Sequence, residues 1–352
     1  MKNIKKLMIV SFVTFLTACG AGASHDHSHD HSHDHDHSHD HDHSHDHDHS
    51  HDHNHSDFEW HTHGTEGSIN IYSARHFVAD EYIFRRFTEE TGIGVNVIFA
   101  HGGQVIARLE AEGHHTEADL IISDDGGMLS NAMSQGLLQP ITPLSNNPLN
   151  GPNGYWHTLS YRARIIATNE EIELTSYLDL ADDRFAGEIL LRPGNHMYNI
   201  SLLASIIEIY GFDTALNWAQ AVVNNAARNP QGNDRDQINA IDAGIGSVAI
   251  VNTYYLELMQ AEGQGENIHL VFPENTHINI SGMAIPRYSN NVDGAIAFIE
   301  FALREEAQNI LRDYNNEFPV DYTPHFNIQQ INFEALYRNH IDAINIMNIV
   351  GW

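Results

Sequence analysis

The sequence predicts an α/β protein with two lobes, each built on an open sheet flanked by helices. From Ser68 onward, short apolar runs typical of strands alternate with amphipathic stretches typical of helices, which is the order of a mostly parallel sheet. This alternation occurs in two separate stretches, and the 285 residues from Ser68 to Trp352 suffice for two lobes. Because ligands of such sheets bind beyond the carboxyl ends of the strands, we expect the ligand site at those ends.

The first stretch contains three strand–helix pairs. The helix after its first strand carries Phe84 and Phe87 and is expected to end at Gly92, since glycine readily adopts the left-handed conformation that closes a helix. The expected strands are 69–72, 95–99 and 118–123, and the other expected helices are 105–112 and 128–136.

The second stretch resembles the first in its alternation. Strands are expected at 162–168, 188–192, 247–252 and 279–286, and helices at 200–210, 214–227 and 236–243. A long amphipathic helix is expected from about 292 to 313. The pattern assigns lobe 1 to 68–165 plus about 279–320, and lobe 2 to 166–278 plus about 321–352.

The charge distribution excludes several partners. The chain has 17 Lys and Arg against 47 Asp and Glu, and its three lysines all lie within the first six residues. From Cys19 onward, 14 Arg face 47 acidic residues, a formal charge of −33. Such a surface repels nucleic acid, so we expect no nucleic-acid partner. With a single cysteine, a disulfide framework and a cysteine-rich zinc module are also excluded.

The first 18 residues are typical of a signal peptide. A basic start is followed by the short apolar run Leu7–Leu16 and by Leu16-Thr17-Ala18-Cys19. This ending resembles a bacterial lipobox, in which the cysteine becomes the lipid-bearing N-terminus; the alternative is an ordinary secretory signal. The sequence therefore predicts a protein anchored through Cys19 to the outer face of the cell membrane, extracellular or periplasmic.

Residues 19–67 are predicted to form a disordered leash that binds metal ions. No apolar residue lies between Ser24 and Asp57, so this segment has nothing with which to form a core. Imidazole and carboxylate groups together suit zinc and other divalent ions, with a solubilising linker as the alternative. The histidines of this tract are His25, His27, His29, His31, His33, His35, His37, His39, His41, His43, His45, His47, His49, His51, His53, His55, His61 and His63.

Polar side chains follow several of the expected strands. His76 follows the first strand, Asp124 and Asp125 follow 118–123, Tyr198 follows 188–192, and Tyr254 and Tyr255 follow 247–252. At these positions side chains project toward a cleft. The alternative for the tyrosine pair is simple packing at the start of a helix.

Segments from about Ile69 to Val320 resemble the ferric-iron-binding substrate-binding proteins of bacterial ABC importers, also called bacterial transferrins. The order and spacing of the motifs carry the resemblance: YSARH at 72–76, RLEAEG at 108–113, LSYRAR at 159–164, LRP…YN at 191–199, NDRDQI at 233–238, NTYYL at 252–256, NISG at 279–282 and NEFPV at 316–320. It implies a two-lobed, type II periplasmic-binding-protein fold with a hinge and an interlobe cleft. It also implies a monomer, no enzymatic activity and an ABC permease as partner.

The resemblance also implies a ligand set. It assigns phenolate ligands to Tyr198, Tyr254 and Tyr255 and an imidazole ligand to His76, holding Fe(III) as cargo. Phenolate is a hard anionic oxygen that suits a trivalent cation. Related sequences often have tyrosine immediately after the histidine, whereas this chain has Phe77.

Because Phe77 has no ligand atom, other groups are needed to complete the coordination sphere. The expected candidates are Asp124, Asp125, water or a synergistic anion such as carbonate or phosphate. For anion binding, the resemblance points to Asn252, and charge alone points to Arg162, Arg192 and Arg235.

The sequence therefore predicts a lipid-anchored protein that captures ferric iron and delivers it to a permease. One alternative is a binding protein for zinc or another divalent metal, with the histidine tract as collector. Another is a metal-dependent hydrolase, which the absence of HExxH and GxSxG motifs disfavours.

Overall fold

The computed structural model describes residues 58–330 and 332–352. The predicted signal peptide, Cys19 and the tract from His25 to His55 lie outside the described residues.

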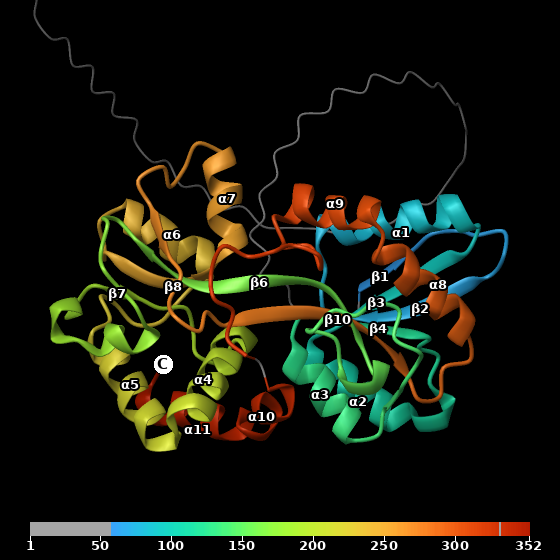
Figure 1. The fold of residues 1–352 in the computed structure, drawn as a ribbon, viewed down its shortest axis with the longest axis horizontal. Helices are drawn as coiled ribbons and strands as arrows, with labels where there is room; N and C mark the ends of the chain where they lie inside the picture. The colour runs from blue at the N-terminus through green and yellow to red at the C-terminus, as the bar shows by residue number, and fades with distance from the viewer. Residues whose placement is uncertain (1–57, 331) are drawn as a thin grey trace, which may run out of the picture. The chain divides into compact units, whose positions relative to one another are not determined.

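The strands form one hydrogen-bonded sheet with the order β1-β3-β2-β4-β10-β6-β8-β7, with β5 paired to β10 and β9 to β6 (Figure 1). The strand β2 runs parallel to both β3 and β4, as the strand–helix alternation predicts. The bounds are β1 Phe58–His61, β2 Ser68–Ser73, β3 Gly94–Phe99, β4 Leu120–Ser123, β5 Leu138–Gln139, β6 His157–Thr168, β7 Ile189–Leu190, β8 Val248–Asn252, β9 His269–Val271 and β10 Ile278–Pro286.

The sequence predicts two separate sheets, whereas the structure joins them through β6 and β10. These strands span 12 and nine residues and are antiparallel to each other. One part of β6 pairs with β10, and its last residues pair with β8 and β9. In Figure 1 both strands run between the group of β1 to β4 and the group of β7 and β8. The sheet is continuous because β10 pairs with β4, β6 pairs with β8, and the two long strands pair with each other.

Helices cover both faces of the sheet. Helices α8 and α9 pack with α1 beside β2, helix α11 packs with α4 and α5, and the short helix α10 contacts both α3 and α4. The bounds are α1 Val78–Thr91, α2 Gly102–Glu112, α3 Gly126–Ser134, α4 Met197–Tyr210, α5 Phe212–Asn224, α6 Asp234–Asp242, α7 Thr253–Ala261, α8 Val292–Ala302, α9 Glu305–Asn315, α10 Phe333–Arg338 and α11 His340–Val350, with short 3₁₀ segments at Gly113–His115, Pro152–Gly154, Tyr177–Ala181 and Asp183–Phe185.

The single long helix predicted for 292–313 is two helices in the structure. The chain turns at Leu303, and Arg304 adopts an extended conformation before α9 begins. The Gln308 side chain donates a hydrogen bond to the Ala302 carbonyl at 2.8 Å, and a second one to the Leu159 carbonyl. This side chain satisfies a carbonyl that the break leaves without its helical partner. A continuous apolar face therefore does not require a continuous helix.

The predicted leash is too long at its C-terminal end. Residues Phe58–His61 form β1, which pairs antiparallel with β3. The Trp60 ring lies 5.4 Å from the Phe84 ring and packs against the core. The apolar residues Phe58 and Trp60 interrupt the polar composition, and strand pairing with a neighbouring edge is enough to order this segment.

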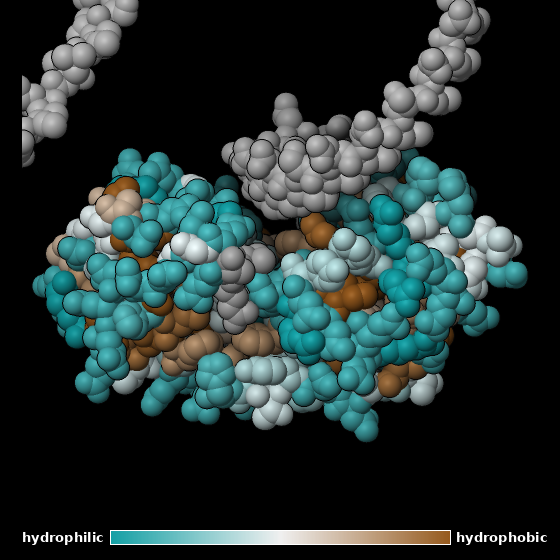
Figure 2. All heavy atoms as spheres, turned by 90° about the horizontal axis from the view of Figure 1, so that it is seen from above, coloured by the Kyte–Doolittle hydropathy of each residue, from teal (hydrophilic) through white to brown (hydrophobic). Residues whose placement is uncertain are grey.

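The hydrophobic cores lie on either side of the sheet. Beneath α1 and α8, Phe87 packs edge-on against Phe298 and Phe301, with ring centroids 5.1 and 5.6 Å apart. A second core lies among α4, α5 and α11 around Trp218 and Met347. The face seen in Figure 2 is mostly hydrophilic. Within the described ranges, no helix combines the length and apolarity needed to cross a membrane.

Candidate metal centre

The three tyrosines named from the sequence start two helices. Tyr198 lies in the first turn of α4, where its backbone N–H donates to Nδ1 of His196, the N-cap. Tyr254 and Tyr255 lie in the first turn of α7, which begins directly after β8. The ring centroids of this pair lie 4.1 Å apart. The phenol groups therefore lie at the starts of two helices that each follow a strand of the sheet: α4 follows β7, and α7 follows β8.

Tyr198 and Tyr254 are buried, Tyr255 is partly buried, and the three phenols interact with one another. Tyr198 is 4% exposed and Tyr254 is 6% exposed. Burial raises the pKa of Tyr198, of Tyr254 and of Tyr255, and the phenols of Tyr198 and Tyr255 each raise the pKa of Tyr254 further. Without a cation the three groups are neutral phenols. A strongly acidic metal ion is the kind of ligand that would displace their protons.

Two arginines flank the Tyr198 ring. The guanidinium carbons of Arg162 and Arg192 lie 5.4 and 5.5 Å from its centroid. Arg162 donates to Glu317 and to the backbone carbonyl of Asp124, and Arg192 donates to Asp234. These positive charges favour a phenolate at Tyr198 over the neutral phenol, opposing the effect of burial.

The Asn252 side chain is a polar group buried at the end of β8. Its Oδ1 and Nδ2 atoms have no hydrogen-bond partner among the described residues, although its backbone N–H donates to Asp234. The Nε atoms of Arg162 and Arg192 are also buried without a partner there. Unsatisfied buried groups cost free energy, and a small anion or water would satisfy donors of this kind.

His76 and Phe77 lie at the start of α1. The half-exposed His76 ring stacks on Phe99 with centroids 4.2 Å apart, and its Nε2 lies 3.4 Å from Oε1 of Glu81. The Phe77 ring lies 6.4 Å from the ring of Tyr254 and so faces the tyrosine pair. In this segment Phe77 is therefore the residue whose ring faces the tyrosines. The predicted imidazole ligand, His76, stacks on Phe99.

The neighbouring carboxylates Asp124 and Asp125 have different environments. Burial raises the pKa of Asp124 to about 6, partly opposed by Arg162, and Asp124 in turn raises the pKa of Tyr198. Asp125 instead caps α3 through the N–H of Gly127 and accepts a 2.6 Å hydrogen bond from Ser201. Asp124 is thus the carboxylate that interacts with the tyrosine group, while Asp125 ties α3 to α4.

Of the arginines selected by charge, Arg235 is not brought to the tyrosines. It lies partly exposed on α6 and pairs with Glu262 at 2.8 Å. Its neighbour Asp234 is fully buried and accepts hydrogen bonds from Arg164 and Arg192. Asp234 was not selected from the sequence, although NDRDQI at 233–238 is one of the motifs that carry the resemblance.

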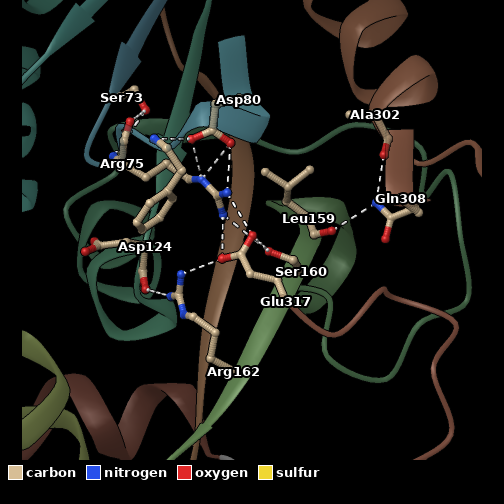
Figure 3. Close-up of polar contacts among 11 residues, drawn as sticks. Ser73, Arg75, Asp80, Asp124, Leu159, Ser160, Arg162, Ala302, Gln308 and Glu317 are labelled. Atoms are coloured by element: carbon tan, nitrogen blue, oxygen red, sulfur yellow. Dashed lines mark hydrogen bonds and ion pairs between the residues drawn. The ribbon is translucent and has the colours of Figure 1, made fainter. Parts of the chain in front are cut away.

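A second buried network links Arg162 to Glu317, Arg75 and Asp80 (Figure 3), and of these four residues only Arg162 is a candidate from the sequence. Glu317 accepts hydrogen bonds from Arg75, Arg162 and Ser160, and Arg75 also pairs with Asp80. Glu317 belongs to the NEFPV motif, which was the only sequence signal for it.

Among residues 58–330 and 332–352, no cluster of three or more His, Cys, Asp or Glu side chains is arranged to hold a metal ion. The candidate centre in the described part of the chain therefore depends on phenol oxygens. Phenolates favour a hard cation such as Fe(III) over the softer ions that imidazole and thiolate bind.

This fold, with a candidate ligand site where strands of its sheet end, is that of a solute-binding protein. The chain belongs to the bacterial extracellular solute-binding protein family, whose model matches residues 116–339.

The relatives confirm the resemblance deduced from the motifs. The chain is 35% identical over 316 residues to iron uptake protein A2 of Synechocystis sp., covering 81% of this chain and 90% of that protein. It is 25% identical to the major ferric iron-binding protein of Neisseria meningitidis serogroup A, covering 75% of this chain and 84% of that protein.

Solved structures confirm the predicted type II periplasmic-binding-protein fold. The ferric binding protein from Campylobacter jejuni superposes with a TM-score of 0.75 at 38% identity, covering 80% of this chain and 99% of that chain. The Trichodesmium IdiA (FutA) structure in complex with iron and citrate gives a TM-score of 0.74 at 36% identity, covering 81% of this chain and all of that chain.

Proposed function

We propose that this chain is an extracytoplasmic binding protein that captures ferric iron between two lobes and delivers it to an ABC permease. The observation that carries the proposal is the group of three phenols, Tyr198, Tyr254 and Tyr255, whose pKa values are raised by burial. The names of the relatives, iron uptake protein and ferric iron-binding protein, support iron as the cargo and binding rather than catalysis as the activity.

In the proposed site, the phenolates of Tyr198, Tyr254 and Tyr255 bind Fe(III) directly. His76 and Asp124 are the protein groups available to add an imidazole or a carboxylate ligand. Asn252, with Arg162 and Arg192, supplies unpartnered donors for a small anion such as carbonate or phosphate. Closure of lobe 1 (68–165 plus about 279–320) on lobe 2 (166–278 plus about 321–352) would complete the site by a hinge motion.

The proposal predicts a coloured ferric complex that does not depend on the histidine tract. Fe(III) supplied as its citrate complex is expected to produce tyrosinate charge-transfer absorption in the full chain and in a variant lacking residues 25–55. The deletion stops before Phe58, because β1 is part of the sheet. The full chain is also expected to bind several zinc ions that the deletion variant does not.

This comparison separates the leading function from its alternatives. A deletion variant that stays colourless with Fe(III) but binds zinc tightly would favour the divalent-metal alternative. Turnover of a phosphate or peptide ester by the metal-loaded protein would favour the hydrolase alternative. Equal zinc binding with and without residues 25–55 would contradict the proposed role of the tract as a collector.

We also propose that a lipid on Cys19 holds the monomer at the outer face of the membrane. The support is the order of basic residues, apolar run and Leu16-Thr17-Ala18-Cys19. A Cys19→Ser variant is expected to leave the membrane fraction, because the acyl chains supply the apolar contact with the bilayer. Fractionation with immunoblotting measures this, and a variant that stays membrane-bound after a salt wash would contradict the anchor.

A further inference from the structure

We propose that Glu317 is a positioning residue of the metal site, holding the Arg75–Phe77 segment and Arg162 in fixed relation to the tyrosines. This inference rests on the proposed ferric site and extends it to a residue that touches none of the proposed ligands. Its basis is the buried network drawn in Figure 3.

Glu317 is held in place by its own backbone as well as by its side chain. It follows Asn316, the left-handed residue that ends α9. The next residue, Phe318, exchanges two backbone hydrogen bonds with Tyr161 on β6, at 2.9 and 3.1 Å. The Glu317 carboxylate is therefore fixed beside one of the two long connecting strands.

The Glu317 carboxylate receives donors from two different segments. Arg75, after β2, donates from two nitrogens at 2.9 and 3.3 Å, and Arg162, on β6, donates at 2.8 Å. The hydroxyl of Ser160 adds a 3.1 Å hydrogen bond. A single carboxylate that accepts from both arginines sets the spacing between them, because charge-assisted bonds of this kind have narrow geometry.

Both arginines then contact rings of the tyrosine site. The Arg75 guanidinium carbon lies 4.9 Å from the Phe77 ring, which faces Tyr254 at 6.4 Å. The Arg162 guanidinium carbon lies 5.4 Å from the ring of Tyr198. One side chain, Arg162, thus lies between Glu317 and Tyr198. Two side chains, Arg75 and Phe77, lie between Glu317 and Tyr254.

Of the two carboxylates that pair with Arg75, Glu317 is the one that favours the ionised form. Burial opposes ionisation, yet Arg75 and Arg162 hold the pKa of Glu317 below its usual value. Asp80, the other carboxylate on Arg75, has a raised pKa because burial outweighs the effect of the arginine. Asp80 makes no described contact with Arg162 and therefore does not replace Glu317 as the link.

The test is Glu317→Gln, which keeps the shape of the side chain and removes its charge. Fe(III) is loaded as the citrate complex, and we measure the charge-transfer band and the rate of iron loss to excess EDTA. We expect a shifted band and iron loss faster by about 10- to 100-fold, the effect of losing a charged hydrogen bond that orients a ligand group. The matched control is Glu112→Gln, which removes a carboxylate paired with Arg108 outside the site.

Because Glu317→Gln leaves buried arginines short of a partner, Glu317→Asp is measured beside it. This variant keeps the charge but is one methylene too short to reach both arginines, so a smaller change in the same direction is expected even if the Gln variant fails to fold. An unchanged band and rate in either folded variant overturns the positioning role. If the unmodified protein forms no coloured complex, the proposed ferric site fails first, and this inference fails with it.

Discussion

Replacing Tyr254 and Tyr255 together with phenylalanine is expected to abolish the ferric charge-transfer absorption and to weaken iron binding by more than about 10³-fold. Losing an outer-shell partner of a metal ligand typically costs 10- to 100-fold in affinity, and this variant loses two direct ligands. The fold should persist, because phenylalanine fills nearly the same volume and the change removes only two hydroxyl groups.

The matched control for this variant is a second pair of tyrosines with tilted, neighbouring rings in the same chain. Tyr82 and Tyr314 lie with ring centroids 4.5 Å apart on the outer surfaces of α1 and α9, and both are exposed. Replacing both with phenylalanine should leave colour and affinity unchanged. Full-affinity iron binding by the Tyr254 and Tyr255 variant, measured by competition with citrate, would show that the pair does not bind the metal.

Iron affinity is expected to fall steeply as the pH falls. Burial holds the pKa values of Tyr198, Tyr254 and Tyr255 above 10, so all three are protonated in the empty protein at neutral pH. Forming three phenolates then releases three protons per Fe(III), and the affinity should change by up to about 10³-fold per pH unit. The direction follows from competition, since protons and iron bind the same oxygens.

Proton release measured by calorimetry in buffers of different ionisation enthalpy gives this number directly. The Tyr254 and Tyr255 double variant should release fewer protons, which separates the phenols from the chemistry of ferric citrate itself. Burial raises the pKa of Asp124 to about 6, so Asp124, when it is a ligand, adds a further proton only below that pH. Release of fewer than one proton at neutral pH would contradict the phenolate site.

Much of the fold follows from local patterns. The expected strands at 69–72 and 95–99 correspond to β2 and β3, and the expected helix end at Gly92 is the left-handed cap of α1. In these elements the apolar residues repeat with the spacing of a strand or helix, and the residues at the ends are typical of element boundaries. The missed strand β1 has neither, since its order comes from pairing with β3, far along the chain.

The site residues are harder to predict from the sequence than the fold, because the direction in which a side chain leaves its helix decides whether it faces the site. In NDRDQI the sequence offers both Asp234 and Arg235 as charged groups, and charge alone selected the arginine. Successive helix residues differ by about 100° in direction, so Asp234 faces Arg164 and Arg192 while Arg235 faces solvent and Glu262. Similarly, the link from Glu317 to Arg75 joins residues 242 positions apart, which no local pattern reports.

The pairing of β1 with β3 also bears on how copies of this protein behave when they are crowded. An open β3 would present the six-residue run Gly94–Phe99, with its row of free backbone donors and acceptors, as a template for the strands of a neighbouring copy. β1 occupies that row, and the opposite end of the sheet is β7, which is only two residues long. β1 then forms the edge itself, but it is only four residues long, so both ends of the sheet offer a neighbouring copy a shorter template than β3 would.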